Sequence, residues 1–240
     1  MPKQDCIIDA CSYIYLQRYK FLKGGKDFTP FDLLKKHVNI KHHSVISDEI
    51  KRTKRRYNEK LLKREAVQIN NREYKLSKHT LEYYDKILYD NAITNATTGK
   101  DKGEKVNLIS AIDSLLKKKT IPIYLSDDIK AIKEKELFNS FLLYNIWTSF
   151  DAVVYLFLVS DEIYYKDAKN AITDLTNFLH QPTYKNYCNS KEKELKSNPE
   201  NRKEIQNKYS EKIRVWTEKT QKRKMEYLSR LELINKLKSN

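Results

Sequence analysis

The sequence is poor in residues that break or cross-link a chain. Its 240 residues include only 4 glycines and 5 prolines, which argues against an all-β protein rich in tight turns and against a low-complexity chain. Its three cysteines, Cys6, Cys11 and Cys188, form an odd set without metal-ligand spacing, so we expect neither a disulfide framework nor a zinc site. Reduced thiols and a cytoplasmic location follow as expectations.

Long apolar runs are also missing. The most apolar stretch, from Ala152 to Ser160, has about half of the roughly 18 residues that a membrane-spanning helix needs. The first residues, Met1 to Asp5, lack the apolar core of a signal peptide. The sequence therefore predicts no membrane association.

Positive charge, by contrast, is abundant. The chain has 47 lysines and arginines against 32 acidic residues, a formal net charge of +15. Its 40% of hydrophobic and 11% of aromatic residues exclude general disorder. The charge predicts a polyanionic partner, and nucleic acid fits better than an anionic membrane.

The order of the apolar segments predicts an α/β domain. Short apolar strands that alternate with amphipathic helices are typical of a mostly parallel sheet. We expect strands at residues 6–9, 43–47, 121–125 and 142–147. Helices are expected from about Ser12, Thr29-Pro30, Asp48-Glu49, Ser77, Glu104, Asp151 and Tyr165, followed by one or two long helices before Asn240.

Acidic residues stand where this pattern ends a strand or begins a helix. In a parallel sheet such positions meet beyond the carboxyl ends of the strands. Two carboxylates about 4 Å apart repel by roughly 4 kcal/mol at an effective dielectric near 20, and a hard cation such as Mg²⁺ or Mn²⁺ removes that cost. Each residue alone could equally be a helix cap or a turn former. The set is Asp9, Glu49, Glu104, Asp127 and Asp128.

Several segments resemble the motifs of PIN-domain nucleases. Ile7-Ile8-Asp9-Ala10-Cys11-Ser12-Tyr13-Ile14 resembles the family's opening strand, and Val45-Ile46-Ser47-Asp48-Glu49-Ile50 resembles its second motif, a strand that leads to a Glu on a helix. Gly103-Glu104, followed by a helix and by Ile121 to Asp128, is similar to a Gly-Glu, helix, strand, Asp-Asp arrangement of several prokaryotic branches. Thr148-Ser149-Phe150-Asp151 resembles the last strand-to-helix turn. The resemblance covers roughly residues 3–185.

This resemblance implies a PIN-like three-layer α/β/α domain over residues 1–185, followed by a basic amphipathic helical extension over residues 186–240. It implies that Asp9, Glu49, Glu104 and one of Asp127 or Asp128 hold Mg²⁺ or Mn²⁺, and that the enzyme cleaves phosphodiester bonds, mostly in RNA. Two departures leave the substrate unassigned. The segment from Lys51 to Lys102 is longer than in compact toxin-type members, and the extension is not part of the minimal fold.

A cationic segment follows Glu49. Residues 51–64 contain eight lysines and arginines and one acidic residue, Glu59. On a helix, part of this set would form one cationic face that could hold phosphates beside the scissile bond, although a solvated polar face is the plain alternative. The expected nucleic-acid contacts are Arg52, Arg55, Arg56, Lys60 and Lys63.

The C-terminal segment allows two interpretations. From His180 to Asn240 there are 16 lysines and arginines against 8 acidic residues. Lys222-Arg223-Lys224 suggests phosphate contacts, whereas the apolar stripe with Trp216 suggests packing on the main domain or on a second copy of the chain. Thr220 and Lys224 interrupt that stripe, which argues against a long regular coiled coil.

The sequence as a whole predicts a metal-dependent endonuclease, with RNA favoured over DNA. The alternative is a catalytically inactive PIN-like module that binds nucleic acid or protein. A third possibility is a toxin or defence effector that stays silent until a regulatory partner engages it. Other chemistries fit less well: Cys11 stands where a haloacid-dehalogenase-like phosphatase needs an Asp, and phosphate-binding glycine loops are missing. Ser12 and Tyr15 have no visible paired base, and His37, His42, His43 and His79 have no firm metal spacing.

Overall fold

The structure is a computed structural model that describes residues 3–23, 26–54, 73–90, 102–127, 145–178 and 202–239. It divides into two compact units, residues 1–156 and 157–240, with the division inside helix α9 (Ser149–Val159). The boundary expected from the sequence, between residues 185 and 186, lies outside the described residues and stays a prediction.

A four-stranded sheet forms the centre of the first unit. Strands β1 (Asp5–Ile8), β4 (Asn39–Lys41), β5 (Ile123–Leu125) and β6 (Ile146–Trp147) are all parallel and lie in the order β4-β1-β5-β6. Strand β1 is buried along its whole length, as expected for a parallel strand that helices cover on both faces. The predicted α/β class with a parallel sheet is confirmed.

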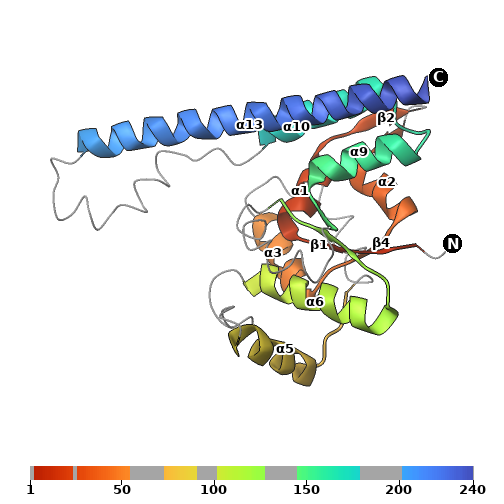
Figure 1. Ribbon diagram of the computed structural model, residues 1–240, viewed down its shortest axis with the longest axis vertical. Helices are drawn as coiled ribbons and strands as arrows, with labels where there is room; N and C mark the ends of the chain where they lie inside the picture. Colours follow the sequence, from red (N-terminus) through yellow and green to blue (C-terminus); the bar gives the residue numbers. More distant parts are fainter. Residues whose placement is uncertain are drawn as a thin grey trace. The chain divides into compact units, whose positions relative to one another are not determined.

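Helix α6 (Lys102–Lys118) covers one face of this sheet (Figure 1). Ile7 and Tyr124 are register partners on β1 and β5, and they pack against Leu108, Ala111 and Ile112 of α6. Helix α5 (Lys78–Asp90) lies on the outer side of α6, where Leu81 and Tyr84 contact Ile109. The apolar stripes predicted for both helices therefore form real packing contacts.

Helices α1 (Ala10–Arg18) and α2 (Pro30–His37) lie on the opposite face (Figure 1). Thr29 caps α2 in a reciprocal capping box with Asp32, and Pro30 takes the first helical position, as the sequence predicted. Tyr13 and Phe31 join the two helices through an edge-on ring contact of 4.8 Å between centroids.

A β-hairpin between α1 and α2 was missing from the sequence prediction. Strands β2 (Phe21–Lys23) and β3 (Lys26–Phe28) pair in antiparallel fashion, with Phe21 opposite Phe28. Helix α1 therefore ends at Arg18, before the hairpin and its two glycines, Gly24-Gly25. Two glycines between short strands are a usual hairpin signal.

The strand predicted at residues 43–47 is wrong. In chain order, the second strand of the parallel sheet is β4, which begins four residues before the predicted strand. Residues 44–54 form helix α3 (Ser44–Lys54) instead. Ile46 and Ile50, one helical turn apart, are both buried, which is the spacing of a helix packed on one side. The β-branched pair Val45-Ile46 favours a strand locally, but tertiary packing overrides this preference.

The strand order creates a switch point between β1 and β5. From β1 the chain passes through α1 and α2 to β4 on one side. It then returns through α3, α5 and α6 to β5 on the other side of β1. In open parallel sheets, the connections diverge at such a point and leave a crevice beyond the carboxyl ends of the two strands.

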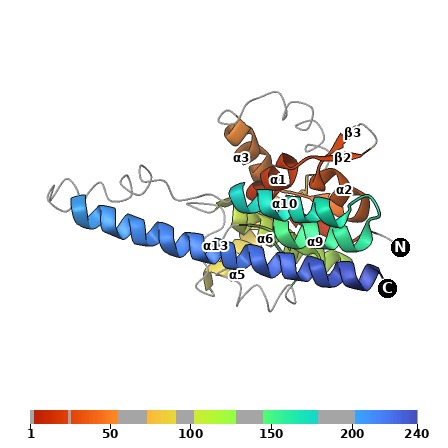
Figure 2. The same cartoon turned by 90° about the horizontal axis from the view of Figure 1, so that it is seen from above.

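The second unit is helical. Helix α10 (Tyr165–Phe178) packs along helix α13 (Arg202–Lys238), and Lys238 Nζ donates a hydrogen bond of 2.9 Å to the carbonyl of Phe157 (Figure 2). The sequence prediction of one or two long C-terminal helices is met by one helix of 37 residues. Within the described part of the chain, no helix combines the length and the apolar character that crossing a membrane requires.

Candidate active site at the carboxyl edge of the sheet

Asp9 follows β1 directly, and its two carboxylate oxygens contact different parts of the fold. Its Oδ1 accepts a hydrogen bond of 2.7 Å from the amide of Ala10, which makes it the N-cap of α1. Its Oδ2 accepts hydrogen bonds from the Cys11 thiol (2.8 Å) and from Ser126 Oγ, 3.1 Å away beyond β5. The carboxylate is 4% exposed. Asp9 therefore caps a helix and also faces the neighbouring strand end.

Asp127 lies two residues beyond the end of β5 and is held by two helix N-termini. Its Oδ2 accepts a hydrogen bond of 2.6 Å from Ser12 Oγ in the first turn of α1. Ser149, the first residue of α9, donates to the same carboxylate through its amide (3.1 and 3.2 Å) and through its hydroxyl. Helix N-termini carry partial positive charge, so they interact favourably with the Asp127 carboxylate.

The two carboxylates act on a common neighbour, the Cys11 thiol. Burial raises the pKa of this thiol well above its usual value, and the charges of Asp9 and Asp127 raise it further. Cys11 thus stays protonated and donates to Asp9. Both carboxylates therefore lie near one partly buried thiol at the β1–β5 switch point, where a crevice is expected.

Glu49 approaches the start of α6. It lies in the second turn of α3, and its carboxylate rests on Gly103, where an added Cβ would lie only 2.6 Å from Glu49 Oε1. A real Cβ essentially never lies that close to another atom, so glycine is what lets Glu49 and the first turn of α6 approach each other. The Gly103-Glu104 pair of the sequence motif thereby gains a steric explanation for its glycine.

Asn107 links three elements beneath these residues. Its Nδ2 donates to the carbonyl of Ile8, the last residue of β1 (3.2 Å), and its Oδ1 accepts from the amide of His43 (3.4 Å) just before α3. The side chain is fully buried. Asn107 therefore fixes α6 and the start of α3 against the strand that carries Asp9.

The side chains of the remaining predicted site residues lie outside the described part of the molecule. Glu104 is placed in the first turn of α6, but its side chain is not described, and neither is that of Arg52 in α3. Asp128, Arg55, Arg56, Lys60 and Lys63 fall in segments without a described structure. Among the described side chains, no group of three or more His, Cys, Asp or Glu has the arrangement of a metal site.

The donor chemistry that is described suits a hard divalent cation. Asp9 and Asp127 offer carboxylate oxygens, which Mg²⁺ and Mn²⁺ prefer over nitrogen and sulfur ligands. Hydroxyls, amides and a protonated thiol donate hydrogen bonds to these carboxylates, and such contacts help to orient metal ligands.

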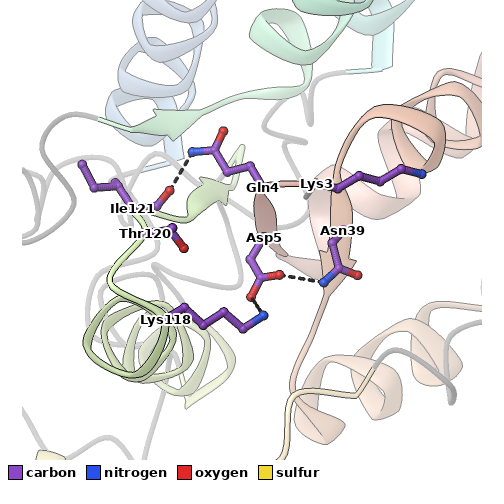
Figure 3. Close-up of a pocket in the computed structure, with 7 residues that line it drawn as sticks. All are labelled: Lys3, Gln4, Asp5, Asn39, Lys118, Thr120 and Ile121. Atoms are coloured by element: carbon purple, nitrogen blue, oxygen red, sulfur yellow. Dashed lines mark hydrogen bonds and ion pairs between the residues drawn. The ribbon is translucent and has the colours of Figure 1, made fainter. Parts of the chain in front are cut away.

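A cleft of about 860 Å³ lies at the opposite edge of the sheet, before the amino ends of β1 and β4 (Figure 3). There Asp5 accepts hydrogen bonds from Lys118 Nζ (2.5 Å), Asn39 (2.6 Å) and Ser114 (2.9 Å). Burial alone would raise the pKa of Asp5, but these partners lower it below its usual value. This edge holds a balanced ion pair, so we assign it a structural role.

Several residues of the site escaped the sequence prediction. Ser126 and Ser149 belong to segments that the sequence predicts as a strand end and a turn, and both bind a predicted carboxylate. Asn107 stands inside the apolar pattern of α6, beside Leu108. A polar residue on a buried helix face is the signal that could have identified it.

Comparison of the chain with models of known protein families, with curated proteins and with solved structures gives no match. The residues and the geometry of this edge of the sheet are therefore the only guide to its function.

Proposed function

We propose that the chain is a PIN-like endonuclease that depends on a divalent metal ion and cleaves phosphodiester bonds in RNA. The observation that carries the proposal is that Asp9 and Asp127 both lie beyond the carboxyl ends of β1 and β5, where each binds a residue of the other's segment and both act on the Cys11 thiol. Two buried like charges at a switch point fit a cation and a phosphate better than they fit a purely structural role.

Each described residue has a part in this proposal. Asp9 and Asp127 would hold Mg²⁺ or Mn²⁺, while Ser12, Ser126 and Ser149 keep their carboxylates in place. When bound, the cation would offset the charge of the scissile phosphate and activate a water molecule. Glu49, Glu104 and Asp128 remain proposed ligands, and the cationic segment after Glu49 remains a proposed phosphate contact.

We also propose a cellular setting for this activity. A nuclease of this kind would act in the cytoplasm as a toxin or defence effector, under the control of a protein partner. Cys6 and Cys11 are free thiols in the structure, and reducing compartments keep thiols in this form.

A cleavage assay with a matched control tests the proposal. Labelled single-stranded RNA is incubated with the wild type, Asp9→Asn or Asp5→Asn, in Mn²⁺ or in EDTA. Asn is as good an N-cap as Asp, so Asp9→Asn changes the charge and keeps the cap of α1. We expect cleavage by the wild type and by Asp5→Asn in Mn²⁺ only, and at least a 100-fold slower reaction with Asp9→Asn.

Two outcomes would contradict the proposal. Cleavage that persists in EDTA, or that Asp9→Asn performs at the wild-type rate, rules out the proposed site. RNA binding by the wild type and by Asp9→Asn, without cleavage by either, supports the inactive binding module instead.

A further inference from the structure

Helix α13 repeats its pattern every 11 residues. Ile205, Trp216 and Tyr227 stand 11 residues apart on its inward stripe, and so do Tyr209, Thr220 and Leu231. These residues are buried or half-buried, whereas most of their neighbours are exposed. Eleven residues make three turns of an almost straight helix, so any feature with this repeat runs along α13 in a nearly straight line.

A row of cations follows the same repeat. Lys208, Lys219 and Arg230 stand 11 residues apart, and Lys212 and Arg223 stand 11 residues apart between them. We call these five residues the cationic row. Arg223 is half-buried and the other four are exposed. From Lys208 to Arg230 the row extends about 33 Å along one side of the stripe.

Acidic residues are mostly kept out of this row. In the described helix between Lys208 and Arg230, Glu226 is the one acidic residue in line with it, whereas Glu211 and Glu218 bind Arg214 on another side. Glu226 and Glu204 pair with Arg230 and Lys208, but both pairs are exposed. Exposed ion pairs contribute little stability, so a phosphate can compete for these cations.

Aromatic side chains border the row. Trp216 is one helical turn from both Lys212 and Lys219, and Tyr209 is one turn from Lys212. Trp216 and Tyr209 are half-buried, so each residue keeps part of its surface in contact with solvent. Near the other end of the row, the Tyr227 ring lies under Arg230, with 4.9 Å from its centroid to the guanidinium carbon.

Among the described helices of the second unit, α10 is much shorter than α13. Its 14 residues extend about 21 Å, whereas the 37 residues of α13 extend about 55 Å. Both views place α10 beside the C-terminal half of α13 (Figures 1 and 2). The row continues along the N-terminal half to Lys208.

We propose that α13 binds single-stranded nucleic acid along the cationic row, with phosphates on the cations and bases against Trp216 and Tyr209. Sites for single strands combine a cationic track with aromatic rings, because every base has a face that can stack. A membrane surface would need the cations but not the half-buried rings between them. This binding does not depend on the proposed cleavage at the carboxyl edge of the sheet.

Two variants of equal charge change test the proposal. The row variant carries Lys212→Gln, Lys219→Gln and Arg223→Gln, and the control carries Lys203→Gln, Arg214→Gln and Lys236→Gln on other sides of α13. Binding of a labelled 20-nucleotide single-stranded RNA to the full chain is followed by fluorescence anisotropy in EDTA over a range of salt concentrations. Circular dichroism and thermal unfolding verify that both variants keep their helices.

We expect the row variant to bind at least 10-fold more weakly than the wild type, and the control less than 2-fold. Loss of three phosphate contacts should reduce the salt dependence of log K by about 2 units of slope. Equal losses in both variants, or no binding by the wild type, would overturn the proposal. The same holds if anionic lipid vesicles bind the row while RNA does not.

The aromatic part has its own test. Trp216→Phe keeps a ring and should bind RNA within 2-fold of the wild type, whereas Trp216→Leu keeps the apolar volume and should bind about 5-fold more weakly. Equal binding by both would contradict base stacking. EDTA prevents metal-dependent cleavage, so binding and cleavage can be measured separately. RNA binding through the cationic row without any cleavage in Mn²⁺ would contradict the proposed nuclease alone. RNA cleavage by a chain whose binding does not depend on the row would contradict this inference alone.

Discussion

A buried aspartate lies at each end of strand β1, and the two aspartates have different hydrogen-bond partners. Asp5, at the amino end, forms an ion pair with the ammonium group of Lys118 and accepts hydrogen bonds from Asn39 and Ser114. Asp9, beyond the carboxyl end, accepts hydrogen bonds from an amide, a thiol and a hydroxyl. Its carboxylate and that of Asp127 both raise the pKa of the Cys11 thiol.

This contrast separates stability from function. A buried charge with an opposite charge beside it serves the fold, provided that its hydrogen bonds are also satisfied. Two like charges near each other cost the fold free energy, and a cation that binds them repays it. We therefore propose a structural role for the amino edge of the sheet and a metal site at the carboxyl edge.

The largest predicted effect concerns the two carboxylates as a unit. Asp9→Asn and Asp127→Asn should each slow RNA cleavage by at least 100-fold, because either change removes one of the two charges that would hold the cation. The double variant should be no slower than the slower single variant, because residues that act as a unit are not additive. Single-turnover rates in Mn²⁺ measure all three. Multiplied losses in the double variant would mean that the two residues act independently.

Asp5→Asn should affect stability instead. Loss of the Lys118 ion pair and of well-formed buried hydrogen bonds should lower the free energy of unfolding by about 1–3 kcal/mol at pH 7, with cleavage within about 3-fold of the wild type. Urea unfolding measures the first quantity. A large loss of cleavage in a folded variant would place chemistry at the amino edge and contradict the contrast.

The loss of stability in Asp5→Asn should depend on pH in one direction only. The pKa of Asp5 is lower in the folded state than its usual value, which is about 3.9 in an unfolded chain. Its stabilising effect is therefore complete above that pH and disappears as the pH falls through the folded-state pKa. The stability difference between wild type and Asp5→Asn should be constant from pH 7 to 5 and shrink below about pH 4. A difference that persists unchanged in acid would exclude the ion pair as its cause.

Gly103→Ala should have a smaller effect on cleavage. The new methyl group would lie within 3 Å of the Glu49 carboxylate, and the flexible end of Glu49 can move away at little cost to the fold. We expect about a 10-fold slower reaction, and a change of less than about 1 kcal/mol in stability because alanine is the better helix former. Glu49→Gln serves as the comparison: if it cleaves normally, the effect of Gly103→Ala does not act through Glu49.

The smallest effect is a gain. In EDTA, Asp9→Asn should raise the free energy of unfolding by up to about 1 kcal/mol, because it removes one of two like charges and keeps the N-cap. Paired urea titrations of wild type and variant measure the difference. A loss of similar size would show that the charge of Asp9 stabilises the fold.

Local patterns predicted the elements that depend on local chemistry. Thr29-Pro30 marked the start of α2, Glu104 marked the first turn of α6, and the strand ends placed Asp9 and Asp127. The strand expected at residues 43–47 failed because Ile46 and Ile50 pack as one helix face, which their β-branched chemistry does not reveal.

The supporting contacts of the site depend on long-range packing. Ser12 meets Asp127 across 115 positions of sequence, and Asn107 meets Ile8 across 99. Such pairs follow from the register of β1 beside β5 and from the seating of α6, and no local pattern contains them. Gly103 was recognised as part of a motif, but its steric reason needed the approach of Glu49.

The most direct test of the account is the stabilisation of the fold by Mn²⁺. Urea unfolding of wild type, Asp5→Asn and Asp9→Asn is measured in EDTA and at a Mn²⁺ concentration far above the dissociation constant. At 100 times that constant, a site present only in the folded state adds about 2.7 kcal/mol. We predict that gain for the wild type and for Asp5→Asn, and almost none for Asp9→Asn. A gain of equal size in all three, or no gain in the wild type, would contradict a metal site at the carboxyl edge.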